Sequence, residues 1–272
     1  MQWENLTSQE FAEAVVATAG VGIIPVGVLE PHSAHLPLGT DAFEAHAVAC
    51  WAAEQESAIV FPFYPYGINH ESAHLPGSVV IKRDLVLALL ENICDEMARH
   101  GLMKIILLNG HGGNRFALPL FVQTLVEKQK PYVVYYADLP FMPDVEGLLE
   151  TQETGHACEA ETSTALYLHA DAVKMHRVPP QPFTSLKRNA ALSAAGLYSP
   201  VDWYAMYPAM YVGDASKATA AKGQVMIQHR IAALVKAIRA VKADDVTPQL
   251  LAEFLRAQQR PAVHEAWTRG KE

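Results

Sequence analysis

The feature that most constrains the fold is a regular alternation of short apolar runs with longer segments of helical periodicity. The clearest run is MKIILLN (103–109), and similar runs stand at 22–29, 58–66 and 132–137. Apolar runs of this length predict buried strands, and the segments between them predict helices. Strands that alternate with helices are typical of an α/β protein with a mostly parallel central sheet.

Helices are expected between and after these strands. They cover 41–54, 83–100, 114–130, 157–169, 216–241 and 247–259. Two prolines in the run 58–66 favour an irregular or edge strand there. Residues 170–213 are rich in Pro, Tyr and Met and resist assignment. Because no repeat and no change of composition separates two cores, we expect a single domain over residues 1–272.

Composition excludes several classes of function. Half of the residues are apolar and 18% are charged, which supports a sizeable core. The formal net charge of −8 argues against a nucleic-acid-binding surface. No apolar run reaches the ~18 residues of a membrane span, and the polar start MQWENLTSQEF does not read as a secretory signal. The cysteines are few and widely spaced, which suits reduced thiols and a cytoplasmic location. They are Cys50, Cys94 and Cys158.

Two polar clusters follow predicted strands, EPHSAHLPLGTD (30–41) and NGHGGN (109–114). Ligands of an open parallel sheet bind beyond the carboxyl ends of its strands, so both clusters can converge on one edge. In an extended segment Glu30 and His32 point to the same side, and the turn LPLGT can return Asp41 to that point. Asp41 could bridge two cations, and His111 would add an imidazole from the second cluster.

Mixed Glu, His and Asp ligation suits Zn²⁺, Mn²⁺ or Fe²⁺. Two such ions about 3.5–4 Å apart form a common hydrolytic centre. Blander interpretations exist for each cluster. A single E-x-H pattern is weak, and NGHGGN could be a glycine-rich turn into a helix or a phosphate cradle. The two clusters together favour the metal site.

A third cluster, GHACEAETS (155–163), precedes an apolar helix. Its carboxylates Glu159 and Glu161 could simply favour the dipole of the helix start. The functional alternative makes Glu161 a metal ligand and His156 a proton-transferring group.

Taken together, these clusters resemble the motifs of the creatininase (creatinine amidohydrolase) family. The first resembles E-x-H-G-P-H-L-P-L-G-T-D, the second N-G-H-G-G-N, and the third H-A/G-G-x-x-E-T-S. Two further segments are similar to family motifs, YGINHESAHLPGSVVI (66–81) and GDASKATAAKG (213–223). The resemblance covers residues 20 to 240, and the motifs stand in the family's order.

The resemblance implies a three-layer α/β/α fold, two divalent metal ions, and hydrolysis of a C–N bond in a cyclic amide or formamide by a metal-bridging hydroxide. Zn²⁺ is the first expectation, with Mn²⁺ or Fe²⁺ as alternatives. Glu30 and His111 would bind one metal, His32 would bind the other, and Asp41 would bridge them. His156 would shuttle a proton to the leaving nitrogen. A small-molecule substrate and a homo-oligomer, a hexamer in the family, are also implied.

The sequence departs from the family pattern at several positions. Creatininase carries a Glu two residues after the second-motif His, where this chain has Gly113; Glu161 or water is expected to take that place. Ser33 and Ala34 replace a Gly-Pro pair, and Ser72 replaces a His. These changes leave two alternatives open. One is hydrolysis of a C–C bond in a cyclic, sugar- or inositol-derived diketone, and the other is a non-catalytic metabolite-binding member of the family.

Other polar residues have two interpretations each. His35 could orient a metal ligand or make one backbone hydrogen bond in a turn. The group His70, Glu71 and His74 could face the pocket or a subunit boundary, or be a solvated loop. Lys222, like Lys217, could contact an anionic substrate, but we favour a solvated face. Four aromatic residues could wall a ligand or pack between subunits: Trp203, Tyr204, Tyr207 and Tyr211.

Overall fold

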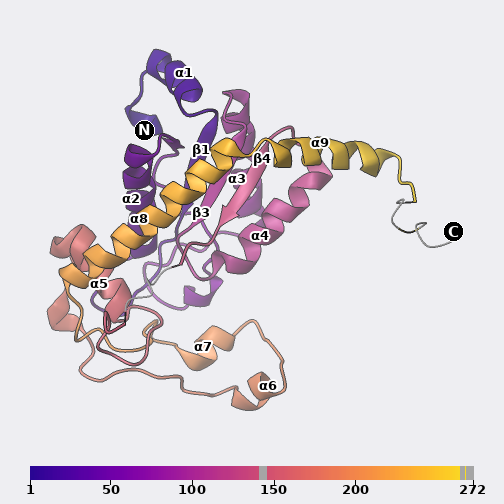
Figure 1. The fold of residues 1–272 in the computed structure, drawn as a ribbon. Helices are drawn as coiled ribbons and strands as arrows, with labels where there is room; N and C mark the ends of the chain where they lie inside the picture. Colours follow the sequence, from indigo (N-terminus) through magenta and orange to yellow (C-terminus); the bar gives the residue numbers. More distant parts are fainter. Residues whose placement is uncertain (141–145, 264–266, 268–272) are drawn as a thin grey trace.

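A computed structural model describes residues 1–140, 146–263 and 267, and its centre is a four-stranded parallel sheet (Figure 1). The strand order is β2-β1-β3-β4, and every neighbouring pair is parallel. The strands are β1 (Val21–Val26), β2 (Ile59–Val60), β3 (Lys104–Asn109) and β4 (Val133–Ala137). Val26 lies opposite Asn109, so β1 and β3 end at the same level of the sheet.

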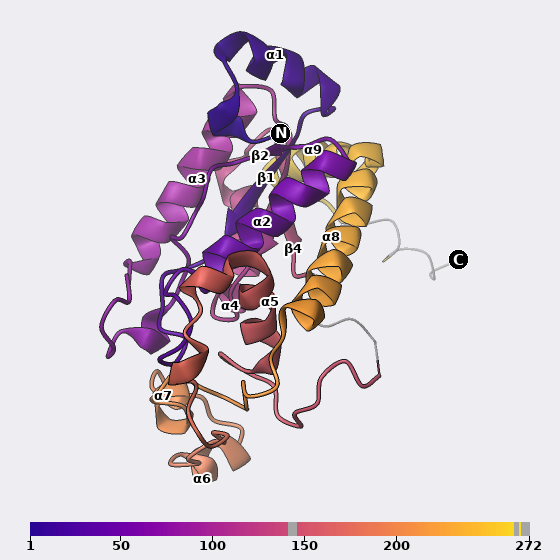
Figure 2. The ribbon, with the colours of Figure 1, turned by 90° about the vertical axis from the view of Figure 1, so that its left-hand side faces the viewer.

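Helices cover both faces of the sheet, as the two views of the ribbon show (Figures 1 and 2). On one face Ile23 and Ile106 pack in a core with α2 (Thr40–Gln55) and α8 (Ala220–Ala243). On the other face Ile24, Ile105 and Leu107 pack in a core with α3 (Arg83–Arg99) and α4 (Asn114–Thr124). Neighbouring strand residues point to opposite faces, so buried runs serve two cores at once. The three-layer α/β/α prediction is confirmed.

The remaining helices lie at the ends of this sandwich. They are α1 (Ser8–Ala17), α5 (Glu159–His169), α6 (Ala190–Ala194), α7 (Asp202–Met206), α9 (Val246–Gln259) and 3-10 turns at Trp3–Asn5, His70–Ser72, Leu125–Lys128, Ala170–Ala172 and Met175–Arg177. Helix α1 was not predicted from the sequence, although its start carries a capping box between Thr7 and Glu10. None of the helices in the described part of the chain is long and apolar enough to cross a membrane.

Several predicted boundaries move for identifiable reasons. The run 58–66 forms a strand only over Ile59–Val60, because the prolines that follow cannot donate to a ladder. Helix α8 begins at Ala220 and not at 216, since the Thr219 side chain accepts a hydrogen bond from the backbone N–H of Lys222 and caps the helix there. The unassigned region 170–213 contributes α6 and α7, which lie at the lower end of the molecule, below α5, in both views (Figures 1 and 2).

Candidate metal site at the strand ends

Two glycines allow helix α2 to start directly against the ends of β1 and β3. A Cβ on Gly27 would lie 2.3 Å from the Cα of Ala42, and one on Gly110 would lie 2.5 Å from the Cβ of Ala45. Any side chain at either position would push the first turn of α2 away. The close approach carries Asp41, in that first turn, to the edge where the β3–α4 loop presents His111.

Asp41 faces two imidazoles, one through each oxygen. Its Oδ1 lies 3.0 Å from Nε2 of His32, and its Oδ2 lies 2.7 Å from Nδ1 of His111. Glu30 completes the group, with Oε1 3.2 Å from the same Nδ1 of His111. The structure therefore brings together the four residues that the first two sequence clusters nominated.

The third cluster lies on the His32 side of this group. Glu161 Oε2 is 3.8 Å from Nε2 of His32 and 3.9 Å from Nδ1 of His156, and it accepts a 2.5 Å hydrogen bond from the backbone N–H of Ala157. Nε2 of His156 lies 3.0 Å from the carbonyl of Pro31. Because a carbonyl can only accept, Nε2 carries the proton and Nδ1 keeps its lone pair, turned toward Glu161.

Burial leaves several of these carboxylate oxygens without a donor. Glu30 is fully buried, and within the described residues neither of its oxygens, nor Oδ2 of Asp41, accepts a hydrogen bond. Nδ1 of His111 is within ion-pair distance of both acids. Buried carboxylates are costly unless they are paired or bind a metal. The orphaned oxygens therefore fit a cation.

The pKa shifts of the histidines at this site reflect the negative charge of the neighbouring carboxylates. Burial alone would lower the pKa of His32, but Asp41, Glu161 and Glu30 outweigh it and raise that pKa to about 10. The pKa of His111 is likewise raised well above its usual range, against burial, by Glu30 and Asp41. His156 behaves oppositely, because burial and the neighbouring His32 lower its pKa to about 4. A divalent cation between the acids would replace the protons on His32 and His111.

Two triplets in the described chain can each place one ligand atom per residue within 4.8 Å of the others. They are Glu30, His32 and His156, and Glu30, Glu71 and His111. Asp41 and Glu161 stand outside these triplets but within 4 Å of their imidazoles. Such a mixture of carboxylates and imidazoles suits Zn²⁺, Mn²⁺ or Fe²⁺. A candidate metal site at the strand ends of a parallel sheet is an arrangement typical of metal-dependent α/β enzymes.

The family follows from comparison with known proteins. The model of the creatininase family, described as creatinine amidohydrolase, matches residues 4–238. The chain therefore belongs to the creatininase family, as its motifs predicted.

Several relatives show the breadth of that family. Creatinine amidohydrolase of Pseudomonas putida is 27% identical over 259 residues, which are 86% of this chain and 95% of that protein. The 3-dehydro-scyllo-inosose hydrolase of Thermotoga maritima is 28% identical, over 80% of this chain and 76% of its own length. A mycofactocin precursor peptide peptidase of Mycolicibacterium smegmatis is 32% identical over 56% of this chain and 59% of its own length.

A solved structure gives the same picture of the fold. A creatininase mutant complexed with creatine superimposes with a TM-score of 0.73, at 25% identity, over 89% of this chain and 99% of that one.

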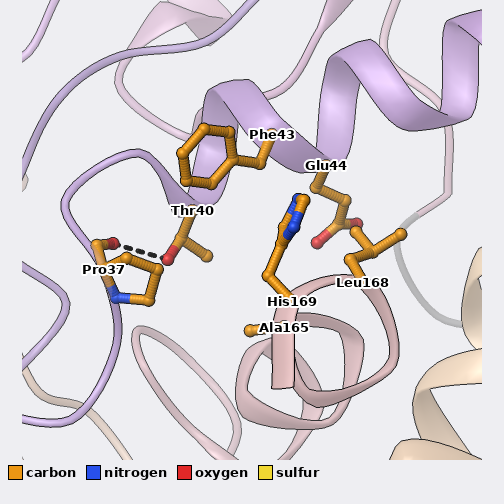
Figure 3. Close-up of a pocket in the computed structure, with 7 residues that line it drawn as sticks. All are labelled: Pro37, Thr40, Phe43, Glu44, Ala165, Leu168 and His169. Atoms are coloured by element: carbon orange, nitrogen blue, oxygen red, sulfur yellow. Dashed lines mark hydrogen bonds between the residues drawn. The ribbon is translucent and has the colours of Figure 1, made fainter. Parts of the chain in front are cut away.

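Helices α2 and α5, which carry Asp41 and Glu161, pack against each other (Figure 3). A small pocket between the two helices is lined by Pro37, Thr40, Phe43, Glu44, Ala165, Leu168 and His169, and none of the candidate site residues borders it. The rings of Phe43 and His169 lie 4.8 Å apart, and Thr164 donates a 2.7 Å hydrogen bond to Glu44. Glu44 and Thr164 each lie three residues, about one turn, beyond Asp41 and Glu161, so their hydrogen bond ties the two helix starts together.

The remaining candidates divide into several environments. His35 is buried, its Nε2 lies 2.9 Å from the hydroxyl of Thr162, and its backbone carbonyl accepts a 2.8 Å hydrogen bond from the N–H of Lys174. Lys222 was expected on a solvated face, but its ammonium pairs with the buried carboxylate of Glu159 and with Glu150. Cys158 is buried, as a packing residue should be.

The group at residues 70–74 also separates. His70 is exposed, while His74 lies 2.7 Å from the carbonyl of Pro208. Glu71 points to the site, with Oε1 3.0 Å from Nε2 of His111. Glu71 was not predicted to be a site residue. Its available signal was a lone carboxylate in a loop that follows a strand.

Proposed function

We propose that the protein is a metal-dependent hydrolase that cleaves a C–N bond in a cyclic amide or formamide. The observation that carries this proposal is the set of buried Glu30 and Asp41 oxygens that lack a donor among the described residues. Membership of the creatininase family supports the reaction class. A structure in that family holds creatine, the size of ligand that we expect here.

We infer that Glu30 and His111 hold one divalent ion, that His32 and Glu161 hold the second, and that Asp41 contacts both. The two oxygens of Asp41 support the bridging role, since each faces a different imidazole. Zn²⁺ is the expected metal, with Mn²⁺ and Fe²⁺ as alternatives. When bound, the pair polarises a carbonyl and lowers the pKa of the water it holds, which supplies hydroxide near neutral pH.

His156 is the group that moves the proton in this proposal. With Nε2–H donated to Pro31, its Nδ1 is free to take a proton and pass it to the departing nitrogen. Glu161, 3.9 Å from Nδ1, stabilises the imidazolium that forms on the way. Trp203 stands edge-on to His156, with ring centroids 6.0 Å apart, and we expect it to form one wall for the substrate.

The direct test is substrate profiling of the metal-loaded protein. We expect turnover of lactams or of formamides, with release of amine or formate. His156→Gln should lower kcat by at least ~10²-fold while the bound metal is retained. Full activity in that variant would contradict the proton-transfer role.

A second candidate function is hydrolysis of a C–C bond in a cyclic diketone. Similarity to 3-dehydro-scyllo-inosose hydrolase over 80% of the chain favours it. Ring opening of a ketone without release of a nitrogen product would select this reaction. A non-catalytic metabolite-binding protein is the remaining alternative, and purified protein without any transition metal would favour it.

We also expect a cytoplasmic homo-oligomer, a hexamer by family resemblance. Size-exclusion chromatography with light scattering measures the oligomeric state directly.

A further inference from the structure

Residue 113 and residue 71 compete for the same space beside His111. A Cβ built on Gly113 would lie 2.4 Å from Oε1 of Glu71 and 2.5 Å from Nε2 of His111. Any side chain at position 113 would therefore displace the Glu71 carboxylate. The second motif has no carboxylate at position 113, and the space that Gly113 leaves is taken by the carboxylate of Glu71.

The segment that carries Glu71 is fixed to both neighbouring motifs. The Asn69 side chain donates a 2.9 Å hydrogen bond to the carbonyl of Leu29, directly before Glu30. The backbone N–H of Ile68 donates to Oδ1 of Asn114, at 2.8 Å, one residue after Gly113. The segment before Glu71 is thus tied to the loop that follows β1 and to the start of α4.

The two nitrogens of His111 face different partners. Nδ1 faces the donor-poor oxygens of Glu30 and Asp41, at 3.2 and 2.7 Å. Nε2 faces the carboxylate of Glu71, at 3.0 Å. An imidazole that ligates a metal through one nitrogen commonly donates its other N–H to a carboxylate, which fixes the tautomer and raises the basicity of the ligand.

We propose that Glu71 is a positioning residue that accepts the Nε2–H of His111 and so presents the Nδ1 lone pair of His111 to the metal ion, in the space that Gly113 leaves open. This inference rests on the proposed function, because it concerns the same metal site. Glu71 occupies the space beside Gly113 without being a ligand, and Glu161 stays the expected ligand on the His32 side, where its oxygen lies 3.8 Å from His32.

The test compares Glu71→Leu, Glu71→Gln and the wild type by metal affinity, measured by competition with a chromophoric chelator. Loss of the acceptor in Glu71→Leu should weaken binding of one of the two ions by about 10–100-fold. Glu71→Gln keeps an amide oxygen that can accept the N–H, so its affinity should fall in between. His70→Gln, in the same 3-10 turn but exposed, is the matched control and should bind like the wild type.

A second measurement separates positioning from a general loss of structure. In the Zn²⁺-loaded wild type, ¹⁵N NMR of labelled histidine should show His111 with its proton on Nε2 and the metal on Nδ1. Glu71→Gln should keep that pattern, which a merely unfolded loop would not.

Three outcomes would overturn the proposal. They are unchanged affinity in Glu71→Leu, metal on Nε2 of His111, and complete loss of one ion in Glu71→Gln that the double variant Glu71→Ala/Gly113→Glu restores. The last result would make Glu71 a ligand. A wild-type protein that binds no metal at all would instead contradict the proposed function, so the two failures are distinguishable.

Discussion

Two groups of buried carboxylates in this protein differ in how their charges are satisfied. Glu44, between α2 and α8, pairs through Oε1 with Arg230 and accepts a hydrogen bond from Thr164 through Oε2. Glu159 accepts hydrogen bonds from the backbone and hydroxyl of Thr151 and pairs with Lys222. Cationic side chains and hydrogen-bond donors of the chain itself satisfy these two carboxylates.

Glu30 and Asp41 lie at the strand ends with oxygens that no described donor satisfies. Both groups are comparably buried, so burial does not distinguish them. The difference lies in where the compensating positive charge comes from. In the scaffold it is covalently part of the chain, whereas at the strand ends it must come from protons on His32 and His111 or from an added cation. The contrast teaches that an unsatisfied buried acid is a better marker of function than a buried acid as such.

The largest effect is expected from Asp41→Asn. An amide cannot bridge two cations as a carboxylate does, so turnover should disappear and bound metal should fall below one equivalent per chain. Activity assays and elemental analysis measure both. Glu159→Gln is the matched control, because Glu159 pairs with Lys222, and this variant should keep the wild-type metal content. Survival of both activity and metal content in Asp41→Asn would remove the bridging role.

Removal of a carboxylate that is paired within the chain should instead lower stability and leave the metal content unchanged. Glu44→Ala deprives the buried guanidinium of Arg230 of its carboxylate, and should lower the free energy of unfolding by about 3 kcal/mol. Metal content should stay at the wild-type value in the folded protein. Denaturant unfolding and elemental analysis provide the two readouts. A normal stability combined with lost metal would erase the distinction between the two groups.

The two histidines of the first motif should titrate in opposite directions in metal-free protein. Against the effect of burial, Asp41, Glu161 and Glu30 raise the pKa of His32 to about 10. His35 has Thr162 and the edge of Tyr211 as neighbours, and burial followed by the charge of His32 lowers its pKa to about 4. NMR titration of labelled histidine measures both values.

The effects of these shifts on stability have opposite signs. His32 stabilises the metal-free fold below its ordinary pKa of 6.5, and this contribution is lost as the pH rises through about 10. His35 stabilises the fold above 6.5, and that contribution is lost as the pH falls through about 4. Similar pKa values for the two imidazoles would show that the carboxylate field at the strand ends is weak.

The smallest effect concerns the turn between these two histidines. Ser33 has φ +57°, in the left-handed region that favours glycine, and the family motif has Gly at this position. Ser33→Gly should therefore raise the free energy of unfolding by about 1 kcal/mol or less. Metal content should not change. A destabilised variant would mean that the serine side chain makes a contribution larger than the backbone strain.

The sequence predicted the parts of this molecule that depend on local pattern. The run 103–109 has the length and the apolar composition of one buried strand, and β3 occupies nearly all of it. The order of strands and helices then placed Glu30, Asp41 and His111 at one edge, because parallel strands end on the same side.

What the sequence could not predict depends on contacts between distant segments. Glu71 reaches His111 across 40 residues from a loop without periodicity. Lys222 resembled a surface residue because nothing near it in the chain reveals that its partner Glu159 is buried. The helices α6 and α7 are only five residues each, too short to leave a periodic signal.

The central claim is that the open carboxylates at the strand ends hold divalent cations. It is tested most directly by elemental analysis of the wild-type protein after chelation, reloading with Zn²⁺ or Mn²⁺, and removal of free metal by gel filtration. We expect two equivalents per chain, together with a higher melting temperature than that of the chelated protein. A folded protein that retains no metal under these conditions would contradict it.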